Sequence, residues 1–110
     1  MARRKQPALH AGKVVFMEKI EHQRSGHRGA FVIMRDGEKL AEQTYTVAGS
    51  RVIIDHTDVD DRLRGTGAGK KLVQAAVEWA RRENVKLMPL CPFAKSVFDK
   101  TPDYSDVLAK

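Results

Sequence analysis

The sequence predicts an α+β fold built from an antiparallel meander, a right-handed β-α-β crossover and a short C-terminal helix. Two observations support this prediction. Between residues 30 and 59, β-rich runs alternate with tight-turn residues, and after the glycines at 65–69 apolar residues recur every three or four positions. A length of 110 residues allows one domain with a single modest core. We therefore expect a basic, flexible tail at residues 1–12 and a single domain at residues 13–110.

The meander is predicted from its turns. Residues 13–20, KVVFMEKI, fit either a short strand or the start of a helix, and residues 22–29, HQRSGHRG, are typical of a polar loop. Residues 30–49 predict a hairpin, because Asp36-Gly37 between two β-rich runs is a strong hairpin signal. A second turn at residues 48–50 leads to a strand at residues 51–59. Strands joined by such short turns pair antiparallel.

The crossover is predicted from a change in the spacing of apolar residues, from the alternation of a strand to the three- and four-residue spacing of a helix. One face of the segment after the glycines is apolar and predicts a buried helix face, made of Leu72, Val73, Ala76, Val77, Trp79 and Ala80. Asn84 suits the left-handed residue that ends such a helix. Residues 85–90, VKLMPL, then predict a buried strand parallel to residues 51–59. Pro92 suits the first position of a last helix, with Cys91 as its cap residue.

Composition narrows the class of protein. Twenty Lys and Arg against 14 Asp and Glu give a net charge of +6, but aromatic residues are only 6 %, so stacking platforms for nucleic acid are few. No segment approaches the roughly 20 apolar residues of a membrane span, and the basic start lacks the apolar core of a secretory signal. A single cysteine is typical of a reducing compartment. We expect a cytoplasmic monomer or weak dimer without membrane or nucleic-acid partners.

The glycine loop, defined here as residues 62–69, is the strongest functional signal. It fails the P-loop pattern, since position 64 is Arg and position 71 is Lys, and it fails the dinucleotide pattern, since position 70 is Lys. What remains is R-x-x-G-x-G between a strand and a helix, which exposes backbone N–H groups at the helix N-terminus. Such a turn binds a diphosphate without a metal. The alternative is an ordinary turn in which glycines relieve strain.

Three motifs in order give a resemblance to a known family. They are His56-Thr57-Asp58-Val59, the glycine loop, and Leu90-Cys91-Pro92-Phe93, followed by Tyr104 and Asp106-Val107. From about residue 29 to the C-terminus the chain resembles the small single-domain branch of the GNAT superfamily of acyl-CoA N-acyltransferases. The resemblance implies a minimal GNAT-like fold, with acetyl-CoA as cosubstrate and an amine as acceptor. It also implies that the outer helices and strands of larger members are missing.

The resemblance assigns residues to the cofactor. Main-chain groups of residues 57–59 would bind the pantetheine arm, backbone amides of residues 64–69 would hold the pyrophosphate, and nearby cations would add a positive field. The implied binding residues are Thr57, Val59, Arg62, Arg64, Gly65, Thr66, Gly67, Ala68, Gly69, Lys70 and Ser96. No His or Cys lies at metal-ligand spacing, so we expect no metal site.

Cys91 is the sharpest catalytic candidate. A helix N-terminus lowers the pKa of a thiol and raises its thiolate fraction. With the resemblance, this favours either an acyl-cysteine intermediate or a polar group that orients the thioester. The alternatives are a small buried apolar residue, and direct attack of the amine on acetyl-CoA.

A general base is also needed, because an amine acceptor must lose a proton. His56 and Asp58 are two residues apart on the expected strand, hence on one face of it, and Glu42 on the neighbouring strand is a weaker candidate. The alternative is a strand histidine satisfied by hydrogen bonds beside a turn-capping Asp58. Tyr104 fits either an acid that protonates the departing thiolate or a packing residue.

The sequence therefore predicts an acetyl-CoA-binding N-acetyltransferase that acetylates an unidentified amine, with Cys91, His56 and Asp58 as catalytic residues. The alternatives are a CoA-binding sensor or adaptor without turnover, and a basic module that binds nucleic acid.

Overall fold

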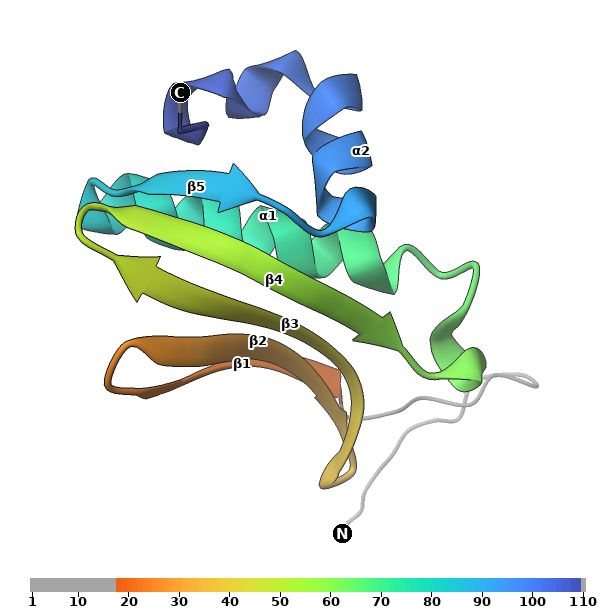
Figure 1. Ribbon diagram of the computed structural model, residues 1–110. Helices are drawn as coiled ribbons and strands as arrows, with labels where there is room; N and C mark the ends of the chain where they lie inside the picture. The colour runs from red at the N-terminus through yellow and green to blue at the C-terminus, as the bar shows by residue number, and fades with distance from the viewer. Residues whose placement is uncertain (1–17, 110) are drawn as a thin grey trace, which may run out of the picture.

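The computed structural model describes residues 18–109, so the expected tail at residues 1–12 lies outside the described residues. Five strands form one sheet in the order β1-β2-β3-β4-β5. They are β1 (Glu18–Ser25), β2 (Arg28–Arg35), β3 (Glu38–Ala48), β4 (Arg51–Val59) and β5 (Lys86–Pro89). The first four pair antiparallel, and β4 pairs parallel with β5, to which the helix α1 (Ala68–Glu83) connects it along the chain. The predicted α+β fold is confirmed (Figure 1).

Shorter elements complete the chain. A 3₁₀ turn, η1 (Asp61–Leu63), precedes α1, and the helix α2 (Pro92–Lys100) and the 3₁₀ segment η2 (Pro102–Val107) follow β5. Cys91 is the N-cap of α2 and Pro92 its first residue, as predicted. Asp36 and Gly37 both have positive φ in the predicted hairpin turn, and Asn84 ends α1 at φ 57°.

The prediction of a polar loop at residues 22–29 is wrong. These residues form the end of β1 and the start of β2, joined by a turn at Gly26-His27, with Ser25 opposite Arg28. Because β1 is a largely exposed edge strand, its sequence lacks the apolar alternation that marks half-buried strands. Of residues 13–20, Glu18–Ile20 begin β1 and the others lie outside the described residues.

The core lies between α1 and one face of the sheet, which we call the helix-covered face. The apolar face of α1 is buried as predicted and packs on Phe31, Ile33, Tyr45, Val52 and Ile54. Figure 1 shows α1 lying behind β4 and β5, with α2 and the C-terminal segment beyond β5. Leu108 forms a parallel bridge with Leu87, so the last residues pair along the outer edge of β5.

A group of rings, the His22 cluster, closes one side of this core. His22 stacks on Phe31 at 4.2 Å between ring centroids, and the ring of Trp79 meets His22 edge-on at 5.0 Å. The Tyr45 hydroxyl and His22 Nε2 are 2.6 Å apart. Burial, followed by the charges of Arg24 and Arg82, lowers the pKa of His22, so the folded chain favours the neutral ring.

Two irregularities in β4 shape the other side of the core. Pairing with β5 ends at Ile54 and Pro89, where the backbone N–H groups of Leu90 and Cys91 both donate to the Ile54 carbonyl at 3.1 Å. Beyond this point β4 runs on to Val59 without β5 beside it.

The second irregularity is a β-bulge at Asp55. Ile54 lies opposite Tyr45 and His56 lies opposite Thr44, so Asp55 is the extra residue. The bulge reverses the alternation of side chains: Ile54 is in the core, and Thr57, rather than His56, reaches Gln43 on the helix-covered face. The Asp55 carboxylate instead accepts a hydrogen bond from the Thr46 hydroxyl at 2.9 Å.

Candidate functional site

The glycine loop carries the chain from β4 into α1. Just before the loop, the Asp60 carboxylate accepts a hydrogen bond from the Arg62 backbone N–H at 2.9 Å and so caps η1. Within the loop, Gly67 is the N-cap of α1, where no side chain caps the helix and no acidic residue lies in the first turn. The first N–H groups of a helix have no intrahelical acceptor, so this end offers donors and a partial positive charge.

The three glycines are required for two different reasons. Gly65 and Gly67 have φ of 78° and 83°, a region that side chains with a Cβ rarely adopt, and an added Cβ would meet nothing within 4 Å. Gly69 has no such backbone requirement. A Cβ there would lie 2.6 Å from the Phe93 ring, so Gly69 leaves room for that ring in its present position.

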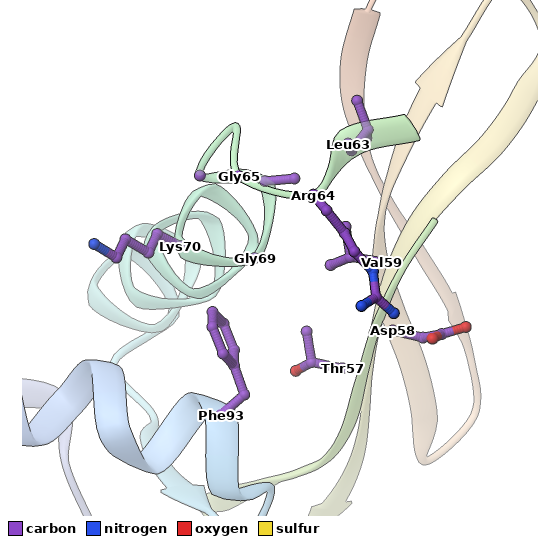
Figure 2. Close-up of a pocket in the computed structure, with 11 residues that line it drawn as sticks. Thr57, Asp58, Val59, Leu63, Arg64, Gly65, Gly69, Lys70 and Phe93 are labelled. Atoms are coloured by element: carbon purple, nitrogen blue, oxygen red, sulfur yellow. The ribbon is translucent and has the colours of Figure 1, made fainter. Parts of the chain in front are cut away.

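A cavity of about 480 Å³ opens between this helix end, β4 and α2 (Figure 2). Nine predicted site residues line it: Thr57, Asp58, Val59, Arg64, Gly65, Gly67, Ala68, Gly69 and Lys70. Leu63 and Phe93 also line it and were not predicted as binding residues. In Figure 2 the Phe93 ring points from α2 toward the glycine loop, and Thr57 lies across the opening from it.

A second cavity, of about 410 Å³, adjoins the first and shares Lys70 and Phe93 with it. Ser96, predicted to contact the cofactor, lies here rather than in the first cavity. Its hydroxyl donates to the Phe93 carbonyl at 2.7 Å. Lys71 and Lys100 also line the second cavity, which therefore has three lysines on its walls.

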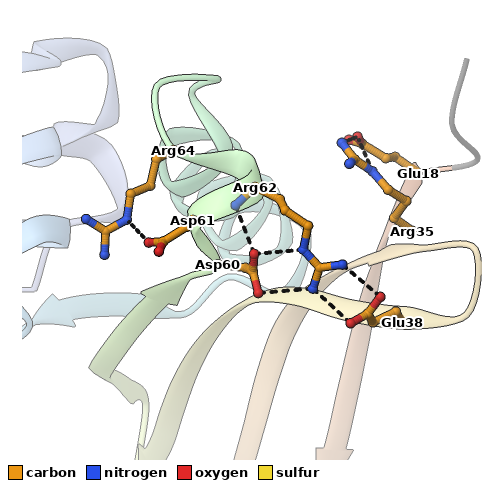
Figure 3. A network of polar contacts seen from close by, with 7 residues as sticks. All are labelled: Glu18, Arg35, Glu38, Asp60, Asp61, Arg62 and Arg64. Atoms are coloured by element: carbon orange, nitrogen blue, oxygen red, sulfur yellow. Dashed lines mark hydrogen bonds and ion pairs between the residues drawn. The ribbon is translucent and has the colours of Figure 1, made fainter. Parts of the chain in front are cut away.

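Arg62 and Thr66 lie in the glycine loop but line neither cavity. The Arg62 guanidinium lies between Asp60 and Glu38, at 2.9 and 2.8 Å (Figure 3). This pairing lowers the pKa of Asp60 to about 2, through the side-chain and backbone hydrogen bonds from Arg62. The Thr66 hydroxyl donates to the Leu63 carbonyl at 2.6 Å. In this arrangement both residues hold the loop in shape, and Arg62 also joins it to Glu38 at the start of β3.

Cys91 lies where β4 and β5 separate and is 6 % exposed. Its sulfur lies 3.5 Å from the Thr57 hydroxyl, but it does not line the first cavity. Burial of the thiol raises its pKa, while the hydrogen bonds from the Thr57 hydroxyl and from the backbone of Ala94 and Phe93 outweigh burial and lower it. The net direction is the one that a helix N-terminus predicts.

His56 and Asp58 do not share the face of Thr57. The bulge at Asp55 turns them to the sheet face opposite α1, called here the open face, and His56 does not line the first cavity. Glu42, the weaker candidate, lies opposite Asp58 in the register and forms an ion pair with Lys39 at 3.2 Å. Glu42, Asp58 and Asp60 line a smaller hollow of about 120 Å³ on this side.

Gln43 was missed by sequence reasoning. It is 1 % exposed, and its Nε2 lies 3.5 Å from the Thr57 hydroxyl oxygen. Its Oε1 is buried without a hydrogen-bond partner among the described residues. The signal was present: β3 alternates, and Gln43 occupies an inward position between Ala41 and Tyr45.

The remaining candidates have simpler surroundings. The Tyr104 ring meets Phe98 at 5.8 Å and lies under the Arg81 guanidinium at 6.0 Å, which favours the packing interpretation. Within residues 18–109 no three His, Cys, Asp or Glu side chains are grouped as metal ligands would be. None of the helices in that range has the length and apolar character to cross a bilayer.

Comparison with known proteins decides the family. Residues 30–107 match the family model of the GCN5-related N-acetyl-transferases. The chain belongs to this family. The match begins inside β2 and ends at the last residue of η2, so it includes the glycine loop, Cys91 and both cavities.

Relatives of the same size are similar along most of the chain. The human protein NATD1 is 29 % identical over 86 residues, which cover 76 % of this chain and 74 % of NATD1. The solution structure of a GCN5-like protein from Staphylococcus aureus is 39 % identical, with a TM-score of 0.61, and covers 81 % of this chain and 87 % of that one. The ribosomal-protein-S18-alanine N-acetyltransferase of Escherichia coli is only 15 % identical, with a TM-score of 0.60 and coverage of 70 % and 53 %, and shares the fold.

Proposed function

We propose that the chain binds acetyl-CoA and transfers its acetyl group to an amine. The observation that carries the proposal is the uncapped N-terminus of α1, which opens into the first cavity. The pyrophosphate would accept hydrogen bonds from the N–H groups of residues 67–70, and the side chains of Arg64 and Lys70 would add charge. The Cβ positions of Gly65 and Gly67 are open, so phosphate oxygens can approach the backbone there.

The rest of the cofactor fits the two cavities together. Because both cavities share Lys70 and Phe93, one extended ligand can occupy both. The pantetheine arm would run beside residues 57–59, where β4 has no β5 neighbour, and bond to its main chain as an added strand does. The adenosine phosphates would lie by Lys71, Ser96 and Lys100. The protein AAC(6')-Iy, which has this fold at 16 % identity and a TM-score of 0.51, was solved with a CoA-containing bisubstrate analogue.

Cys91 provides the route of transfer. Its thiolate would attack the thioester carbonyl carbon, an S–C bond to the acetyl group would form, and CoA would leave as a thiolate that takes up a proton. An amine would then attack the acetyl-cysteine, lose a proton to a base and release the Cys91 thiolate. The lowered pKa of Cys91 increases the thiolate fraction for the first step.

The acceptor would reach the acetyl group from the open face of the sheet. His56 and Asp58 lie on that face, beside a hollow with three carboxylates, Glu42, Asp58 and Asp60. We assign His56 as the base that takes the amine proton, with Asp58 beside it on the strand.

A CoA-binding domain without turnover is the second candidate. The observation that favours it is the separation of the parts: Cys91 does not line the first cavity, and His56 lies on the opposite face of the sheet. In that case the two cavities would hold CoA, and no acetyl group would move.

Intact-protein mass spectrometry after incubation with acetyl-CoA separates the two. A gain of about 42 Da in the wild type, absent from Cys91→Ala, supports transfer through the thiol, provided that it forms and decays fast enough for turnover. Retention of CoA under native conditions without that gain, and without CoA release in the presence of amines, supports the silent domain. Failure to retain CoA contradicts both.

A further inference from the structure

Three polar side chains from three elements meet beneath the first cavity, and we call them the Cys91 cluster. Gln43 comes from β3, Thr57 from β4, and Cys91 from the cap of α2. The Thr57 hydroxyl is the central group: Gln43 Nε2 and Cys91 Sγ each lie 3.5 Å from it. The first distance is long for a hydrogen bond between nitrogen and oxygen, and the second is ordinary for sulfur.

The direction of these hydrogen bonds depends on the amide of Gln43. Nε2 only donates, so with Nε2 toward Thr57 the hydroxyl oxygen can accept from Nε2 and from a Cys91 thiol, and its hydrogen stays free to point at the sulfur once that is a thiolate. That arrangement suits a thiolate. With the amide turned over, Oε1 would take the hydroxyl hydrogen, and the sulfur would have to be the donor, as a thiol.

Among residues 18–109 the amide has one hydrogen-bond partner, the Thr57 hydroxyl. Its Oε1 is buried and unpaired among the described residues, and the whole residue is 1 % exposed. A buried acceptor without a partner lowers stability, and an apolar residue of the same length avoids that loss. Stability therefore does not explain why an amide occupies this place.

We propose that Gln43 is a positioning residue that turns the Thr57 hydroxyl toward the Cys91 sulfur and thereby favours the Cys91 thiolate. It acts through Thr57, since its amide contacts the hydroxyl and not the sulfur. A role of Gln43 in catalysis rests on the proposed acetyl transfer through Cys91. The effect of Gln43 on the protonation of Cys91 does not depend on that transfer.

The test is a pH titration of the cysteine ¹³Cβ signal in the NMR spectrum of the full chain, without CoA. The chain has one cysteine, so the signal needs no assignment. We expect Gln43→Met to raise the pKa of Cys91 by about one unit, which is about tenfold less thiolate at a pH below both values. Should this variant not fold, Gln43→Leu replaces it. Its side chain also lacks a donor for the Thr57 oxygen, so the same rise in the pKa of Cys91 is expected.

A second mutation tests whether the effect passes through Thr57. Thr57→Val removes the hydroxyl and should itself raise the pKa of Cys91. In the Thr57→Val background, Gln43→Met should have no additional effect. The matched control is Tyr45→Phe, which removes a buried hydroxyl from the same strand but from the His22 cluster, and should leave the titration unchanged.

Two results overturn the proposal: an unchanged pKa in Gln43→Met, or an equal rise in the Thr57→Val background. Failure of the proposed function gives a different result. The Cys91 titration would respond to Gln43 as described, while mass spectrometry showed no acetyl group on the wild type.

Discussion

Two polar clusters flank β3 on the helix-covered face, and they are built in opposite ways. Toward β1, the Tyr45 hydroxyl and His22 Nε2 are 2.6 Å apart and surrounded by aromatic rings. Toward β4, the contacts of Gln43 and Cys91 with Thr57 are both 3.5 Å, and one amide oxygen has no partner. Gln43 and Tyr45 are only two residues apart on β3.

The two clusters differ in how completely their polar groups are hydrogen-bonded, and under our proposal the incomplete one, the Cys91 cluster, is the one that takes part in chemistry. Buried polar groups that serve stability find short, complete hydrogen bonds. The Cys91 cluster leaves such bonds incomplete beside the first cavity. We therefore expect changes near the His22 cluster to alter stability alone, and changes around the first cavity to alter CoA binding or the Cys91 thiol.

The largest expected effect on CoA binding is that of Gly67→Ala. An alanine at φ 83° costs about 1–2 kcal/mol of stability, and its Cβ enters the space proposed for phosphate, so CoA affinity falls about tenfold. Gly49→Ala is the matched control, since Gly49 has φ 65° with nothing near its Cβ, in a turn far along the chain from the loop. Calorimetric titration with CoA and thermal unfolding measure both effects. Equal CoA affinity in the two variants would show that the glycine loop is not part of the CoA-binding site.

Gly29→Ala tests the opposite side of β3. A Cβ at Gly29 would overlap the Tyr45 ring, so the ring must move and its contact with His22 is lost. We expect a loss of about 1–3 kcal/mol in the free energy of unfolding, measured with urea. CoA affinity should not change. A variant as stable as the wild type would show that the His22 cluster is loosely packed.

A smaller effect on CoA affinity is expected from two cationic residues in or next to the glycine loop, Arg62 and Lys70, which differ in their ion pairs. Within residues 18–109 Lys70 forms no ion pair, whereas Arg62 is held by Asp60 and Glu38. Lys70→Ala should weaken CoA binding about threefold and reduce its dependence on salt. Arg62→Ala should weaken CoA binding less than Lys70→Ala does, since Arg62 supports the loop without lining the cavity, and it should raise the pKa of Asp60. A larger loss of CoA affinity in Arg62→Ala than in Lys70→Ala would show that Arg62 itself binds CoA.

The smallest effect is a pH dependence of stability. The pKa of His22 is lowered in the folded chain, so the unfolded chain binds more protons, and stability falls as the pH drops from 6.5 through the folded value. His22→Phe keeps a stacking ring without a titrating group. Its urea midpoint should change less than that of the wild type between pH 6.5 and the folded pKa of His22.

Asp60 affects stability in a separate pH range. Its contribution to the free energy of unfolding is present above pH 3.8 and is lost as the pH falls toward about 2.

Local signals predicted much of the fold and part of the site. Three features depend on residues close together in the sequence, and all three are as predicted: the turn at Asp36-Gly37, the helix α1 and the cap at Cys91-Pro92. The bulge at Asp55 has no Gly or Pro to mark it, so the simple alternation of β4 pointed to His56 where the structure places Thr57 beside Cys91. The ion pair of Arg62 with Glu38 joins residues 24 apart in sequence, a pairing that no local pattern encodes.

The pairing of Leu108 with Leu87 covers part of the outer edge of β5, where another chain could otherwise pair with the sheet. The Ala109 N–H donates to the Leu87 carbonyl at 2.7 Å, so the chain itself occupies the hydrogen-bonding row of the sheet at that point. A peptide cannot extend the sheet beside Leu87 without displacing these residues. An acceptor that docked as an added strand would have to use another edge, such as that of β1, if the proposed transfer takes place.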